Sequence, residues 1–118
     1  MNDKEIKIFY EVLDVLNMKK LEHPREYNNV NTKFIFKEER HVTNNVVKGI
    51  IMFELNNEYI VDIYIDNGMD NILNGLLNLK FNNFEHAKEE YDNLLKYLDY
   101  TDILTILTDA KQKLLLNN

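Results

Sequence analysis

The feature that most constrains the fold is a run of alternating residues from Glu58 to Asp66. Tyr59, Val61, Ile63 and Ile65 would lie on one side of the chain, and Ile60, Asp62, Tyr64 and Asp66 on the other. A repeat of two residues is the period of a β-strand. Asn56-Asn57 comes just before this run, and asparagine tolerates the positive φ angles of a two-residue hairpin turn. We therefore predict a hairpin between strands Val46–Leu55 and Glu58–Asp66.

The segments around the hairpin complete the expected fold. A third strand is predicted over Thr32–Glu39, after a connection over Glu22–Asn31 and before a turn at Val42–Asn45. Apolar residues at helical spacing predict helices over Asp3–Asn17, Met69–Lys80, Phe84–Leu98 and Thr101–Leu116. Their predicted caps are Asp3, Asn82 or Asn83, and Thr101. This order, α-β-β-β-α-α-α, predicts a single α+β domain over residues 1–118, with a three-stranded antiparallel meander packed against helices.

The hairpin register assigns side chains to two faces of the sheet. A two-residue turn pairs Leu55 with Glu58, Ile51 with Asp62 and Gly49 with Tyr64. We assign one face to the core under the helices: Ile50, Met52, Tyr59, Val61, Ile63 and Ile65. The other face carries Phe53 and Tyr64 beside Asp62 and Asp66, and an aromatic anchor ringed by charges is typical of a protein interface. The alternative is that the first helix or a loop covers this face.

Charge is distributed unevenly along the chain. Residues 1–48 contain eight acidic and nine basic residues, whereas residues 49–109 contain twelve acidic residues and three lysines. Glu85, Glu89 and Glu90 would lie on the exposed side of the helix around Tyr91. We therefore predict Asp62, Tyr64, Asp66 and Phe53, with a second patch of Glu85, Glu89 and Glu90, as the partner-binding residues. The alternative is that both acidic regions are simply solvated surface.

Composition argues against several classes of function. The chain has no cysteine and no serine, which excludes thiolate and serine nucleophiles. His86 and Glu90 are one helical turn apart but lack a third metal ligand, so we predict no metal site, no catalytic residues and no cofactor. Dispersed lysines and two arginines argue against direct nucleic-acid binding. The N-terminus does not resemble a signal peptide and no apolar run is long enough for a bilayer, so we expect a cytoplasmic protein without membrane attachment.

In size, acidity and element order, the chain resembles some phage-encoded anti-CRISPR inhibitors, which are small acidic proteins. In size and charge it is also similar to bacterial immunity proteins that block basic toxins. This resemblance implies an inhibitor of a basic, nucleic-acid-handling protein, encoded by a phage or mobile element. We therefore predict a non-enzymatic module that binds a basic protein partner. The alternatives are a structural homo-oligomer, such as a homodimer through the apolar first helix, and a small metal-dependent enzyme.

Overall fold

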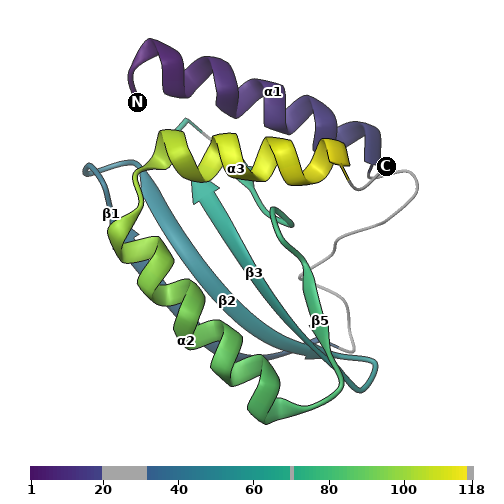
Figure 1. The fold of residues 1–118 in the computed structure, drawn as a ribbon. Coiled ribbons are helices and arrows are strands. Elements are labelled where there is room, and N and C mark those ends of the chain that lie inside the picture. The colour runs from purple at the N-terminus through teal and green to yellow at the C-terminus, as the bar shows by residue number, and fades with distance from the viewer. Residues whose placement is uncertain (20–31, 70, 117–118) are drawn as a thin grey trace.

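The described part of the chain forms three helices and an antiparallel sheet. The computed structural model describes residues 1–19, 32–69 and 71–116, so the predicted connection over 22–31 lies outside the described residues. The elements are α1 (Asp3–Lys19), β1 (Thr32–His41), β2 (Val47–Leu55), β3 (Glu58–Asp66), β4 (Ile72–Leu73), β5 (Leu79–Phe81), α2 (Phe84–Tyr100) and α3 (Ile103–Leu116) (Figure 1). The sheet order is β1-β2-β3-β4, and β5 also pairs with β3. The predicted α+β fold is confirmed.

The hairpin of β2 and β3 has the predicted turn and register. Asn56 and Asn57 have φ angles of 53° and 66°, the left-handed conformation that a tight hairpin turn requires at both positions. Leu55 pairs with Glu58, and Gly49 pairs with Tyr64. Because side chains alternate along a strand, this register decides which residues face the helices.

The main core lies between the sheet and the helices. The sheet contributes the predicted face, with Ile50, Met52, Val61, Ile63 and Ile65 buried and Tyr59 packed against them. Helix α2 lies over β2 and β3, while α1 and α3 lie side by side at one end of the sheet (Figure 1). All three helices contribute buried residues to this cluster, among them Phe9 of α1, Tyr91 of α2 and Leu107 of α3.

The prediction of a helix over Met69–Lys80 is wrong. The described part of this segment instead holds the short strands β4 and β5 and the loop between them. Gly75 and Asn78 have positive φ angles of 74° and 49°, which an α-helix cannot contain. The backbone N–H groups of Gly75, Leu77 and Asn78 donate to the side chain of Asp62 on β3. This tertiary contact replaces the internal hydrogen bonds that a helix would have formed.

Helix starts follow the expected chemistry, but two of the capping residues differ. Asn83 caps α2, as predicted, by accepting a hydrogen bond from the His86 N–H at 3.2 Å. Asn2, not Asp3, caps α1, since its Oδ1 accepts from the Glu5 N–H while Glu5 accepts from the Asn2 N–H, both at 2.8 Å. Asp102, not Thr101, caps α3 by accepting from the Thr105 N–H at 2.8 Å.

Candidate functional site

An apolar groove lies between α2 and α3 over strand β3. The two helices diverge from the short turn at Thr101 and Asp102, and β3 lies beneath the space between them (Figure 1). The cavity has a volume of about 400 Å³, within the range of about 300–1,000 Å³ that is common for ligand sites. We call it the interhelical groove; it is lined by Ile63, Leu76, Leu77, Glu90, Asn93, Leu94, Tyr97, Ile106, Asp109, Ala110, Gln112, Lys113 and Leu116.

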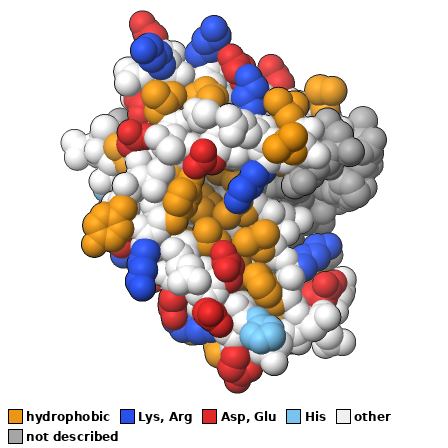
Figure 2. All heavy atoms as spheres, in the orientation of Figure 1, with side chains coloured by type: hydrophobic (Ala, Val, Ile, Leu, Met, Phe, Trp, Pro, Cys, Tyr) orange, Lys and Arg blue, Asp and Glu red, His pale blue; other side chains and the backbone are white. Residues whose placement is uncertain are grey.

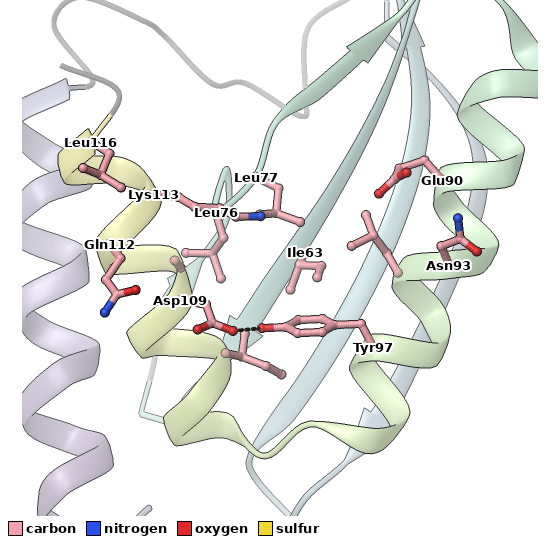
Figure 3. Close-up of a pocket in the computed structure, with 13 residues that line it drawn as sticks. Ile63, Leu76, Leu77, Glu90, Asn93, Tyr97, Asp109, Gln112, Lys113 and Leu116 are labelled. Atoms are coloured by element: carbon pink, nitrogen blue, oxygen red, sulfur yellow. Dashed lines mark hydrogen bonds between the residues drawn. The ribbon is translucent and has the colours of Figure 1, made fainter.

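Each wall of the groove comes from a regular helical spacing. Helix α2 presents Glu90, Asn93, Leu94 and Tyr97, which are three or four residues apart and therefore share one side of the helix. Helix α3 presents Ile106, Asp109, Ala110, Lys113 and Leu116 in the same way. Ile63 of β3 and Leu76 form an apolar base (Figure 3). Hydrophobic side chains therefore gather in a hollow on this face, with charged side chains around it (Figure 2).

Tyr97 and Asp109 bridge the narrow end of the groove. The Tyr97 hydroxyl donates a hydrogen bond to Oδ2 of Asp109 at 2.7 Å, joining α2 to α3 (Figure 3). Burial raises the pKa of Tyr97, and the bond to Asp109 raises it further, so the hydroxyl keeps its proton at neutral pH. The Tyr97 hydroxyl therefore serves as a hydrogen-bond donor that joins α2 to α3.

The open end of the groove carries a free carboxylate. Glu90 points into the space between the helices from the α2 wall (Figure 3). Its carboxylate and those of Glu85 and Glu89 make no hydrogen bond or ion pair with any residue that the structure describes. Lys113, on the α3 wall, likewise makes no ion pair in the described ranges. Three of the predicted binding residues are thus available for an intermolecular contact.

Most other acidic residues of the 49–109 region are engaged within the fold. Asp92 pairs with Lys88 and Asp99 pairs with Arg40, each at 2.6 Å. Asp66, which is half-buried at the end of β3, accepts a hydrogen bond from the Gly68 N–H at 2.8 Å. Asp102 caps α3. The excess of acidic residues in this region is therefore partly a consequence of internal bonding.

Asp62 supports the side of the groove opposite the helices. It is fully buried, with 0% of its surface exposed. Its Oδ2 accepts from the Gly75 N–H at 2.5 Å, and its Oδ1 accepts from the N–H groups of Leu77 and Asn78 at 2.9 and 3.0 Å. These bonds fix the loop that carries Leu76 and Leu77 into the groove, so Asp62 positions the site without facing it.

The second face of the sheet is not the exposed interface that the sequence suggested. Phe53, Tyr64 and Ile51 are buried there together with Ile60, and Tyr64 is only 7% exposed. The expected exposure of Phe53, Asp62 and Tyr64 is therefore wrong, since all three side chains are buried. A two-residue period assigns side chains to two faces of a strand but does not show whether either face is exposed to solvent. The Tyr64 hydroxyl instead donates to Glu39 at 2.5 Å, which lowers the pKa of that carboxyl.

Two other properties bear on the class of site. Among residues 1–19, 32–69 and 71–116, no three histidine or acidic side chains lie close enough together to hold a metal ion. Within the same ranges, no helix has the length and apolar character needed to cross a membrane.

No protein-family model, curated protein or solved structure matches this chain. The groove is therefore the feature of the molecule that indicates a function. The sequence predicted Glu90 as a binding residue but gave no prediction for Tyr97, Asp109 or Lys113. The row of Ile106, Ala110, Lys113 and Leu116 was visible as a second helical stripe on α3, but nothing local showed that α2 would diverge from it.

Proposed function

We propose that this protein is a non-enzymatic module that binds a partner protein through the interhelical groove. The observation that supports this proposal is an apolar groove, open to solvent, with the carboxylate of Glu90 on one wall and without an ion-pair partner among the described residues. A partner would insert apolar side chains between α2 and α3, and its charged groups would meet Glu90 and its neighbours. Apolar centres with polar rims are the usual arrangement in protein interfaces.

The shape of the groove favours a protein over a small molecule. Small-molecule sites enclose most of their ligand. Here the base is buried, but Leu77 and Leu94 are only partly buried and Leu116, at the rim, is 82% exposed. Apolar surface thus continues out of the cavity, where a larger partner could cover it.

Three carboxylates of α2, one of them in the groove wall, lack an ion-pair partner within the described residues and favour a basic partner. Glu85, Glu89 and Glu90 would attract a positively charged surface and increase the rate of association. This agrees with the predicted inhibitor function, in which an acidic cytoplasmic protein binds a basic, nucleic-acid-handling protein. The groove supplies the apolar anchor site that charge alone does not provide.

The proposal is tested by crosslinking in the organism that encodes the protein. A photoreactive benzoylphenylalanine replaces Asn93, which is exposed and lines the groove, or Asn17, which is exposed on α1 away from it. We expect a discrete protein adduct from position 93 that is missing from position 17. The captured protein, once purified, should form a one-to-one complex with the wild type. Identical adducts at both positions, or no complex between purified proteins, would contradict the proposal.

A second candidate is a homo-oligomer formed through the first helix. The observation that favours it is the exposure of Ile6, Tyr10 and Met18 on α1. Light scattering over a range of protein concentrations tests it. A mass that doubles with concentration, and returns to the monomer value when Met18 is replaced by Gln, would support self-association over the binding of a different protein.

A further inference from the structure

We propose that the occupant of the interhelical groove is a short amphipathic helix of the partner, with apolar residues on one face and lysine or arginine on the flank that meets α2. This inference rests on the proposed function and specifies the chemistry of the partner. It follows from the form of the groove, the position of its charges and the pairing of nearby carboxylates.

The form of the groove suits a helix. Its two walls are themselves helices that diverge from the Thr101 turn, and its base is a row of apolar side chains over β3 (Figures 1 and 3). A helix laid between two others can bury one apolar face and satisfy its own backbone hydrogen bonds, so the groove need not supply backbone partners. A row of anchors at i, i+3, i+4 and i+7 would meet such a base.

The charges of the groove assign the polar flank of that helix. On the α2 wall, Glu90 lines the groove and Glu85 and Glu89 precede it on the same helix; all three carboxylates lack an ion-pair partner within the described residues. Asp109, on the α3 wall, is already bonded to Tyr97. The carboxylates without a bonding partner among the described residues therefore lie on the α2 side, where a basic side chain would pair with them. Lys113, on the α3 wall, would face the opposite flank.

Fluorescein-labelled helical peptides of about 15 residues, near the length at which isolated helices begin to be stable, provide the test. Three peptides carry leucine at the four anchor positions. Their remaining positions are lysine in the first peptide, glutamine in the second and glutamate in the third. A fourth peptide has the composition of the lysine peptide in scrambled order. Binding is measured by fluorescence anisotropy on wild type, Asn93→Trp, Asn17→Trp, Glu90→Gln and Asp14→Asn.

Tryptophan at position 93 would fill the groove, whereas the same substitution at exposed Asn17 would not. We expect the lysine peptide to bind the wild type more tightly than the glutamine, glutamate and scrambled peptides. Asn93→Trp should weaken it at least about tenfold, and Glu90→Gln about threefold, the scale of one partly exposed ion pair. Asn17→Trp and Asp14→Asn should leave its affinity unchanged.

Different failures separate this inference from the proposed function. If the glutamine or glutamate peptide binds as tightly as the lysine peptide and is weakened by Asn93→Trp, the groove remains a protein site but the basic partner is wrong. If the scrambled peptide binds equally well, attraction is only electrostatic and the helical occupant is wrong. If Asn93→Trp changes the affinity of none of the peptides but weakens binding of the small dye anilinonaphthalene sulfonate, the groove is a small-molecule site and both proposals fail.

Discussion

At the residue scale, Asp62 shows how a single side chain decides a local structure. The spacing of Ile72, Leu73, Leu76 and Leu77 is compatible with a helix, although Gly75 in the middle of the segment disfavours one. The deciding contact comes from a carboxylate 13 residues before Gly75. Because this carboxylate binds three backbone N–H groups, the segment forms a loop that delivers Leu76 and Leu77 to the groove.

Asp62→Asn should lower the free energy of unfolding by about 3 kcal/mol, the scale for losing hydrogen bonds to a buried charged group. Both carboxylate oxygens accept backbone N–H groups, so an amide must turn its NH₂ group toward one of those donors. Urea unfolding measures the change, and exposed Glu85→Gln is the control, expected within about 0.5 kcal/mol of wild type. Equal stability of Asp62→Asn and wild type would show that these bonds do not hold the loop.

Asp102 gives a prediction about pH. The hydrogen bond from the Thr105 N–H lowers the pKa of Asp102 below its ordinary value of 3.8. Its stabilising effect is therefore fully present above pH 3.8 and is lost as pH falls through the lower, folded-state pKa. Asp102→Ala should reduce the melting temperature at pH 6, and the difference from wild type should shrink below pH 3.8. Asp102→Asn, which keeps the cap, should show a smaller reduction; a pH-independent gap for Asp102→Ala would contradict this role.

At the element scale, the parts predicted correctly are those whose signals are local. The period of two from Glu58 to Asp66 and the Asn56-Asn57 turn fixed the register of β2 and β3 without any long-range information. The amphipathic spacing of α2 and the cap at Asn83 are local in the same sense. The burial of Tyr64 and the divergence of α2 from α3 depend on contacts between distant segments, so neither could be predicted from periodicity.

The pairing of Gly49 with Tyr64 gives a prediction for the sheet. A methyl group at position 49 would overlap the Tyr64 ring, which lies directly over this glycine. Gly49→Ala should therefore lower the free energy of unfolding by about 2 kcal/mol, the usual scale for overpacking. In a Tyr64→Leu background the same substitution should cost less, because the ring is absent. Equal costs in both backgrounds, measured by chemical denaturation, would exclude the ring contact as the cause.

At the scale of the whole molecule, the uneven distribution of charge has two sources. Several acidic residues of the 49–109 region serve the fold itself as caps, loop supports and ion-pair partners. Glu85, Glu89 and Glu90 serve none of these purposes within the described residues. Sequence counts alone could not separate the two groups, although they did lead to the carboxylates on α2.

Replacing Glu85, Glu89 and Glu90 together by Gln should slow association with a basic partner and flatten the dependence of that rate on salt. The control replaces Asp3, Asp14 and Glu58, which lie on α1 and β3 instead of α2, by Asn or Gln and so changes the net charge equally. Stopped-flow association at two salt concentrations distinguishes the two variants. If both slow association equally, only total charge matters and the α2 carboxylates have no particular role.

The most direct test of the groove as a binding site is the affinity of the crosslinked partner for two tryptophan variants. Asn93→Trp and Asn17→Trp make the same substitution at exposed helical positions, one lining the groove and one outside it. Both variants are first checked to have the melting temperature of the wild type. Titration calorimetry should then show that Asn93→Trp weakens binding at least about tenfold, or about 1.4 kcal/mol, while Asn17→Trp matches wild type. Unchanged affinity for Asn93→Trp would contradict the proposal that the partner occupies the interhelical groove.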